Sequence, residues 1–124
     1  MIEVSWYDKE TEIVLWRFSG KWTEQEYENA SLEHWALTMP DHEAVNVIVD
    51  LRQGFGPRNL IKLVISGFRS PRQNVNQVVV VGSAATWKSL YNMVTHMIGK
   101  QRIQLHFAEN SNEAERILHE AVSV

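Results

Sequence analysis

The chain has 124 residues, of which 44% are hydrophobic and 22% charged, with a formal net charge of −3 and no cysteine. This length and composition predict a single globular domain with one core. The mild negative charge argues against a nucleic-acid or membrane-surface protein, and the lack of cysteine excludes disulfides, thiolate metal sites and thiol nucleophiles. The first residues lack the basic and apolar regions of a signal peptide, and no run is apolar enough to span a membrane. We therefore expect a cytoplasmic protein.

Two β-rich runs at the N-terminus, residues 2–7 and 12–19, flank a polar turn and predict a β-hairpin. Within the second run, Arg17 shares one side with Ile13 and Leu15. Its other side is apolar as well, so this strand is expected to be covered on both faces.

A first helix is expected to begin at Thr23, because Thr23 and Glu26 have the spacing of a capping box. Apolar residues then recur at near-helical spacing until Pro40, which marks the end of the helix.

The run Val45–Leu51 is rich in β-branched residues and predicts a buried, parallel strand with Asp50 at its carboxyl end. Residues 52–56 are expected to form a loop. Pro57 is then expected to open a second helix, since its fixed φ and missing N–H suit the first helical position. The inner face of that helix is expected to carry Leu60, Leu63, Val64 and Phe68.

Four consecutive valines within residues 77–82 predict the next strand, and residues 84–98 predict a third helix ended by Gly99. A fifth strand is expected at 103–107, followed by a fourth helix from Asn110. The inward residues of that helix would be Ala114, Ile117, Leu118 and Ala121. The order β-β-α-β-α-β-α-β-α predicts one α/β domain over residues 1–124, with a mixed five-stranded sheet, an antiparallel N-terminal hairpin and parallel later strands.

Several segments of this layout carry a resemblance to a known group. They are Phe18–Thr23, Val47–Leu51, Val78–Gly82, and Phe107 with Glu113-Ala114. Over nearly its whole length the chain resembles the STAS and SpoIIAA-like group, which implies a SpoIIAA-like fold and a regulatory or partner-binding role. In the anti-sigma-antagonist branch of that group, the turn after the third strand carries a phosphorylated serine. The corresponding residues 50–57 contain no Ser or Thr, so we expect no serine phospho-switch there.

No catalytic constellation can be recognised, and we expect neither an enzyme nor a metal or cofactor. Ser83 is interpreted as a helix cap, because it lacks the context of a nucleophilic serine. Gly54 and Gly56 form only a fragment of a phosphate-binding loop. The histidines lack the spacing of zinc ligands and are interpreted as surface or hydrogen-bonded core residues. They are His34, His42, His96, His106 and His119.

Charge is distributed unevenly along the chain. Residues 23–44 contain six carboxylates and no Lys or Arg, whereas residues 50–73 contain five Lys or Arg and one Asp. One interpretation is that these are solvated helix faces that attract each other weakly. The other is that Arg52 and Arg58 lie at the carboxyl edge of a parallel strand, where ligands of open α/β sheets tend to bind.

Most large aromatic side chains are expected in the core, whereas those near turns are expected to be partly exposed. The core set comprises Trp16, Phe18, Trp35 and Trp87. The exposed set comprises Trp6, Trp22 and Phe55. An exposed Phe55 beside Arg52 would suit a loop that docks a partner, since aromatic and Arg side chains are enriched at interface hot spots.

These observations predict a binding site around the carboxyl end of the third strand. Its residues would be Asp50, Arg52, Gly54, Phe55, Gly56, Arg58 and Lys62. The first hypothesis is a non-enzymatic regulatory module that engages a protein partner, or a second copy of itself, through this edge and the apolar second helix. The alternative is a small-ligand or anion-binding domain in which Arg52, Arg58 and the Gly54 and Gly56 amides act as donors.

Overall fold

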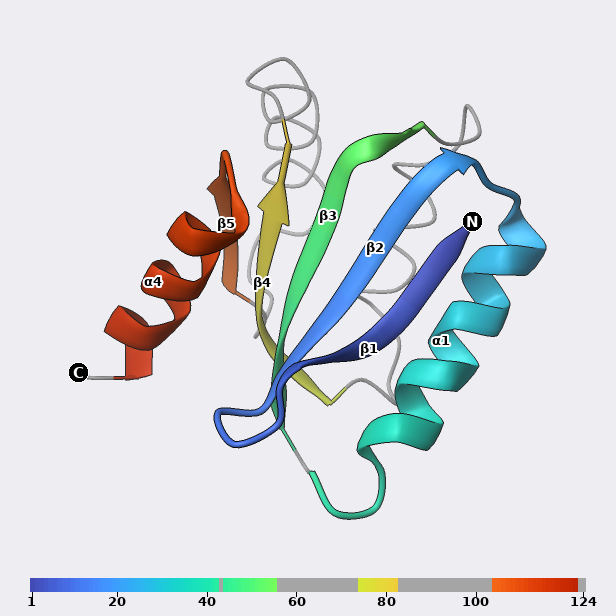
Figure 1. The fold of residues 1–124 in the computed structure, drawn as a ribbon. Coiled ribbons are helices and arrows are strands. Elements are labelled where there is room, and N and C mark those ends of the chain that lie inside the picture. The colour runs from blue at the N-terminus through green and yellow to red at the C-terminus, as the bar shows by residue number, and fades with distance from the viewer. Residues whose placement is uncertain (43, 56–73, 83–103, 123–124) are drawn as a thin grey trace.

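The sequence folds into one mixed five-stranded sheet with helices packed on it. The structure, a computed structural model, describes residues 1–42, 44–55, 74–82 and 104–122 (Figure 1). The strands are β1 (Ile2–Asp8), β2 (Ile13–Lys21), β3 (Val45–Phe55), β4 (Val75–Val81) and β5 (Gln104–Ala108). The described helices are α1 (Glu24–Thr38) and α4 (Ser111–Val122). The strand order is β1-β2-β3-β4-β5; β1 is antiparallel to β2 and all other neighbours are parallel, as predicted.

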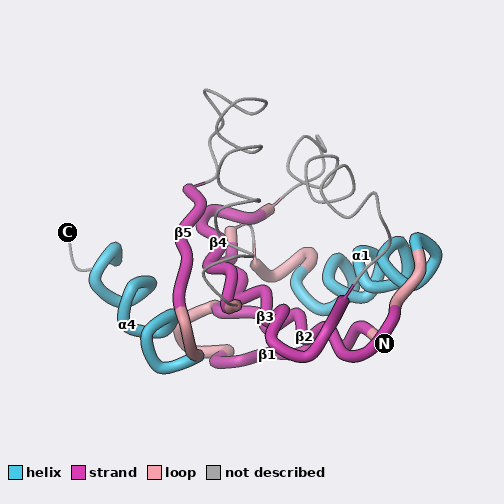
Figure 2. Tube along the Cα trace, turned by 90° about the horizontal axis from the view of Figure 1, so that it is seen from above, coloured by secondary structure: helices cyan, strands magenta, loops and turns pink. Residues whose placement is uncertain are grey.

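Each face of the sheet contributes to a separate apolar core, because successive strand residues point to opposite faces. On the face that carries α4, strand residues such as Ile13 and Ile48 pack with Ala114 and Leu118. On the opposite face, the core is built largely from valines, and Leu37 of α1 packs against it. Its buried members are Val14, Val45, Val47, Val78 and Val80. Figure 2 shows the two helices on either side of the twisted sheet. We call the two faces the α4 face and the α1 face.

The ends of α1 agree with the sequence prediction. Thr23 is the N-cap and its Oγ1 accepts a hydrogen bond from the backbone N–H of Glu26 at 3.2 Å. At the other end, the N–H of Met39 donates to the carbonyl of Trp35 at 2.9 Å, and Pro40 follows. No described helix is long and apolar enough to cross a membrane.

A buried hydrogen-bond network attaches α1 to the sheet. The indole Nε1 of Trp16, on β2, donates to Nδ1 of His34 at 3.1 Å, and Nε2 of His34 lies 3.0 Å from Oδ1 of Asn74, which directly precedes β4. Nδ2 of Asn74 in turn donates to Oγ1 of Thr38 at 2.9 Å and to the carbonyl of His42 at 3.1 Å. Of the two interpretations given for the histidines, surface residue or hydrogen-bonded core residue, His34 fits the second.

The prediction that residues 52–56 form a loop is wrong for residues 52–55, which continue β3. The reason is non-local: β2 extends to Lys21 and its last residues pair with β3, as Ser19↔Gln53, Gly20↔Gly54 and Lys21↔Phe55. The start of the predicted second strand is also shifted, because Glu12 has a φ of 58° and belongs to the turn before β2.

The prediction that Trp22 is partly exposed is wrong as well. Trp22 is buried, because its ring packs edge-on against Phe18 at a centroid distance of 5.1 Å and against Tyr27 at 6.0 Å. Phe18 is buried as expected, and Trp6 is half-buried. The predicted second and third helices, and Trp87 with them, lie outside the described residues.

Candidate functional site

Asp50 and Arg52 lie together in the middle of β3, and the prediction that Asp50 ends this strand is wrong, because β3 continues to Phe55. Asp50 lies on the α4 face, two residues after the core residue Ile48. Nε of Arg52 donates to Oδ1 of Asp50 at 3.0 Å, and an Nη of Arg52 donates to Oδ2 at 2.9 Å. The backbone N–H of Arg52 also donates to Oδ1 at 3.0 Å. The guanidinium is therefore held in one orientation by a bidentate pair.

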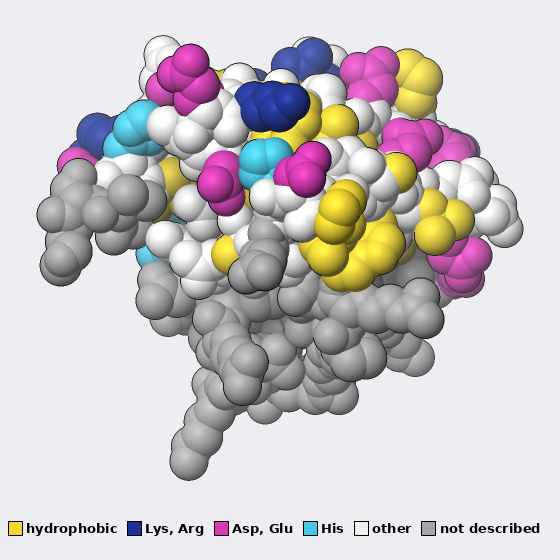
Figure 3. All heavy atoms as spheres, turned by 90° about the horizontal axis from the view of Figure 1, so that it is seen from below, with side chains coloured by type: hydrophobic (Ala, Val, Ile, Leu, Met, Phe, Trp, Pro, Cys, Tyr) yellow, Lys and Arg dark blue, Asp and Glu magenta, His cyan; other side chains and the backbone are white. Residues whose placement is uncertain are grey.

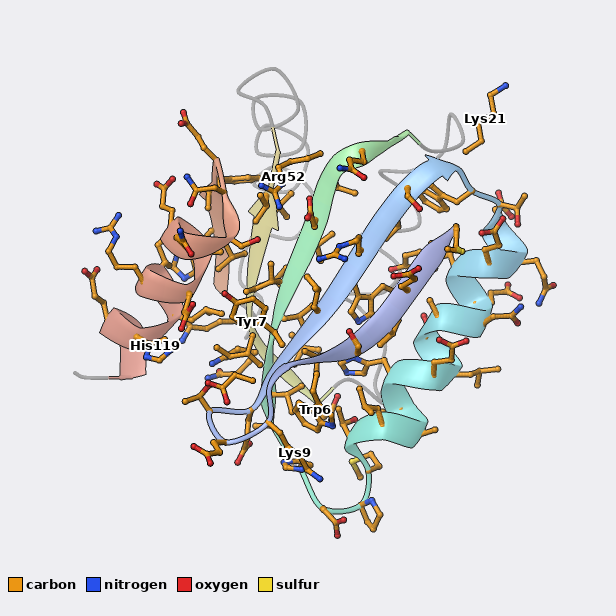
Figure 4. The ribbon with its side chains drawn as sticks, viewed as in Figure 1. Trp6, Tyr7, Lys9, Lys21, Arg52 and His119 are labelled. Carbon is orange, nitrogen blue, oxygen red and sulfur yellow. The ribbon has the colours of Figure 1, made fainter. Side chains whose placement is uncertain are left out.

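A change in strand register places Arg52 in this position. Arg17 of β2 is the register partner of Asp50, but the next partners in the ladder are Ser19 and Gln53, so β3 carries one more residue than β2 between these pairs. An extra residue of this kind bends a strand and re-aims its side chains. Here, Arg52 can fold back onto Asp50 while an Nη donates to Oγ of Ser111 at 3.3 Å. The contact joins β3 to the first residue of α4. Figure 4 shows Arg52 on the side of β3 toward α4.

Arg17 adds a second guanidinium to the same region. Glu3, Arg17 and Asp50 are register partners across β1, β2 and β3, so their Cα atoms form one row across the sheet. Glu3 and Arg17 are exposed, as is Ser5 two residues along β1. We call the surface formed by Glu3, Ser5, Arg17 and Arg52 the open face.

The open face lies beside α4 and is not covered by it. α4 packs against β3, β4 and β5. Near the carboxyl end of β1, the hydroxyl of Tyr7 donates to Oε2 of Glu115 of α4 at 2.8 Å. In Figure 1 no described helix lies in front of the first half of β1 or of the adjacent part of β2.

The charges around Asp50 keep its carboxyl group ionised. Burial alone would raise its pKa, since the side chain is only 8% exposed. The side-chain and backbone hydrogen bonds from Arg52 and the charges of Arg52 and Arg17 outweigh burial, and the pKa of Asp50 lies below its ordinary value. Asp50 therefore acts as a fixed anion that orients Arg52.

The arrangement is suited to recognition. Asp50 and Glu3 match the charges of Arg17 and Arg52, so these four residues carry no net positive charge that would attract a free anion. Among the described residues, no group of three or more His, Asp or Glu could hold a metal ion. Side chains that can donate and accept hydrogen bonds, with balanced charge and with Arg52 held in one orientation, resemble the polar part of a protein interface.

The predicted site residues are only partly placed by the structure. Asp50 and Arg52 are brought together, and the backbones of Gly54 and Phe55 belong to β3 beside Gly20 and Lys21. Gly56, Arg58 and Lys62 lie outside the described residues, as do the apolar residues 60–68 on which self-association was predicted.

Sequence reasoning did not include Arg17 and Ser111 in the site. Strand alternation had placed Arg17 on the side of Ile13 and Leu15, which is the α4 face. That signal could have identified Arg17, had the register between β2 and β3 been known. No local signal links Ser111 to Arg52, which lies 59 residues earlier in the chain.

Comparison with known proteins supports the fold. No protein-family model matches the sequence, and no match was found among curated proteins. The structure is similar to the crystal structure of an uncharacterised protein of the DUF3478 family, with a SpoIIAA-like fold, from Shewanella loihica PV-4. The two chains share 15% sequence identity, with a TM-score of 0.67, and the alignment covers 95% of this chain and 92% of the other. The mixed sheet described above is therefore a SpoIIAA-like fold, as the resemblance in the sequence predicted.

Proposed function

We propose that this protein is a non-enzymatic regulatory module that binds a protein partner through the open face. The observation that carries the proposal is that Arg17 and Arg52 both lie next to the buried carboxylate of Asp50, Arg17 as its register partner on β2 and Arg52 through two side-chain hydrogen bonds. Arg is enriched among the residues that contribute most to protein interfaces. The proposed partner offers backbone carbonyls or carboxylates to these two side chains.

The orientation of Arg52 supports this proposal on energetic grounds. A free Arg side chain loses rotamer entropy when it is immobilised in an interface, which costs on the order of 1 kcal/mol. Asp50 and Ser111 already fix Arg52, while 42% of its side chain stays exposed. Arg52 therefore loses much of its side-chain entropy on folding and not on binding. The exposed part of its guanidinium remains available to a partner.

Balanced charge supports a protein partner over a small anion. Glu3 and Ser5 supply acceptors and a hydroxyl beside the two Arg side chains, so the open face can both donate and accept hydrogen bonds. The resemblance to the STAS and SpoIIAA-like group implies a partner-binding role of the same kind. Because residues 50–57 contain no Ser or Thr, the proposed regulation does not operate through a phosphoserine in that segment.

Affinity capture from the native cell with charge-reversal variants tests the proposal. Arg17→Glu reverses a charge on the open face, and Lys9→Glu makes the same change of charge in the exposed β1–β2 turn. We expect the wild type and Lys9→Glu to retain one protein that Arg17→Glu loses. Thermal unfolding of both variants checks that they are folded. If Arg17→Glu captures that protein in unchanged amount, or if Lys9→Glu loses it equally, the open face is not the docking surface.

A further inference from the structure

α1 has an inner side that accounts for its packing within the chain. Ala30, His34 and Thr38 are buried and recur every four residues, and Leu37 packs against the core of the α1 face. This spacing is the usual one for the face of a helix that contacts its own sheet. The inner side thus accounts for how α1 binds to the rest of the molecule.

A second apolar row lies on the other side of the same helix. Leu32, Trp35 and Ala36 of α1 and its C-cap residue Met39 are spaced as i, i+3, i+4 and i+7, which is again the spacing of a packing face. Leu32, Ala36 and Met39 are exposed, with Leu32 at 69%, and Trp35 is half-buried. We call these four residues the outer stripe. The inner side alone accounts for the packing of α1, so the outer stripe is available for a second contact.

The outer stripe lies in an acidic surrounding. Glu24 and Glu28 continue the row that leads to Leu32 at intervals of four residues. Glu24 and Glu26 lie in the first turn of α1, where the helix dipole favours carboxylates. Glu28 and Glu33 lie beyond that turn, and neither forms an ion pair with another described residue. Figure 3 shows carboxylates beside hydrophobic side chains at the right of the view, where α1 lies.

Charge decides which kind of partner fits this surface. Residues 23–44 carry six carboxylates and no Lys or Arg. A second copy of α1 laid against the outer stripe would bring carboxylates opposite carboxylates, which is unfavourable in a desolvated interface. We infer that the outer stripe docks a basic amphipathic helix of another protein, whose apolar face packs on Leu32 and Met39 and whose Lys or Arg side chains pair with Glu28 and Glu33. This inference is independent of the proposed function, because the outer stripe and the open face lie on different elements.

A designed peptide provides the direct test. The probe is a fluorescein-labelled helical peptide of about 20 residues, with Leu at i, i+3, i+4 and i+7 and Lys on the other side. Its comparison peptide has the same composition in scrambled order. Fluorescence anisotropy with the full chain measures binding of both. We expect the periodic peptide to bind at least about tenfold more tightly than the scrambled one.

Matched variants locate the binding on α1. Leu32→Glu and Glu28→Lys are each expected to weaken binding of the periodic peptide by about tenfold. Glu10→Lys makes the same charge change as Glu28→Lys in the exposed β1–β2 turn and is expected to weaken it by less than about twofold. Arg17→Glu, on the opposite side of the sheet, is expected not to weaken it. Circular dichroism checks the fold, and Leu32→Ala provides a milder change at the same position.

Three results would overturn the inference. The first is equal binding of the scrambled peptide, which would show attraction by charge alone. The second is unchanged affinity in both Leu32 variants. The third is a dimer of the wild type, measured by light scattering, together with a monomer of the Leu32→Glu variant. That result would show that the outer stripe binds a second copy of this chain.

Discussion

The tautomer of His34 follows from its two hydrogen-bond partners. The indole N–H of Trp16 can only donate, so Nδ1 of His34 must accept, and Nε2 must carry the proton and donate to Oδ1 of Asn74. Protonation of Nδ1 would place its N–H opposite the indole N–H of Trp16, and two donors cannot form a hydrogen bond. Burial also lowers the pKa of His34, although the hydrogen bond to Asn74 opposes this shift. The folded protein therefore holds His34 as a neutral imidazole.

A pH dependence of stability follows from this lowered pKa. Because the pKa of His34 is lower in the folded than in the unfolded chain, its contribution is fully present above the unfolded value of about 6.5 and is lost as the pH falls toward the folded pKa. We expect urea unfolding to give a larger drop in stability from about pH 7.5 to about pH 5 for the wild type than for His34→Gln. The pKa of His106 is lowered as well, by burial, but His106 is present in both proteins. Equal drops in the two proteins would contradict the neutral, hydrogen-bonded His34.

Removal of Arg52 is expected to leave the carboxylate of Asp50 buried without its main partner. Arg52→Ala should therefore lower the free energy of unfolding by about 1–3 kcal/mol. Arg116→Ala is the matched control, because Arg116 pairs with Glu120 at 3.5 Å on the exposed side of α4, and its loss should cost less than about 0.5 kcal/mol. Urea denaturation of the three proteins measures both values. Equal costs for the two variants would show that the Asp50–Arg52 pair does not hold the site together.

At the scale of elements, two leucines distinguish the inner and outer surfaces. Leu118 of α4 is 1% exposed in the core of the α4 face, whereas Leu32 of α1 is 69% exposed. Leu118→Ala is expected to lower the free energy of unfolding by about 2–5 kcal/mol, because it leaves a cavity. Leu32→Ala is expected to change it by less than about 0.5 kcal/mol. A comparable loss in Leu32→Ala would mean that the outer stripe contributes to the fold, which leaves no reason to assign it to a partner.

The N-cap of α1 provides a further prediction for an element. Thr23→Ala removes the acceptor for the N–H of Glu26 and should cost about 1 kcal/mol of stability. Thr23→Ser keeps the hydroxyl and is expected to cost less. Thermal or urea unfolding compares the three proteins. An equal loss in the Ala and Ser variants would show that the cap hydrogen bond is not the source of the effect.

Element boundaries were predictable from sequence where the signal is local. The cap at Thr23, the end at Pro40 and the valine run of β4 are all set by neighbouring residues, and α1 and β4 lie where these residues predict them. Arg52–Phe55 were predicted as a loop, because they contain Gly54 and polar residues and their partner strand lies more than 30 residues earlier. Trp22 was misjudged for the same reason, since its burial depends on contacts with Phe18 and Tyr27.

At the scale of the whole molecule, the site depends on strand register. The sequence alone identified Asp50 and Arg52 as candidate site residues, because both stand at the end of a β-rich run. The sequence could not show that Arg17 lies beside Asp50 in the strand register, or that α4 begins beside Arg52. These neighbours come together only when the sheet assembles. The open face and the outer stripe lie on opposite sides of this sheet, so a partner on one would leave the other accessible.

Photo-cross-linking in the native cell tests the central claim, which is that a protein partner docks on the open face. A photoreactive phenylalanine analogue is placed at Ser5, an exposed residue of the open face, and separately at Glu10 in the exposed β1–β2 turn. We predict one covalent adduct with another protein from position 5, its loss when Arg17→Glu is added, and no such adduct from position 10. The absence of any adduct from position 5, or the same adduct at equal yield from both positions, would contradict the claim.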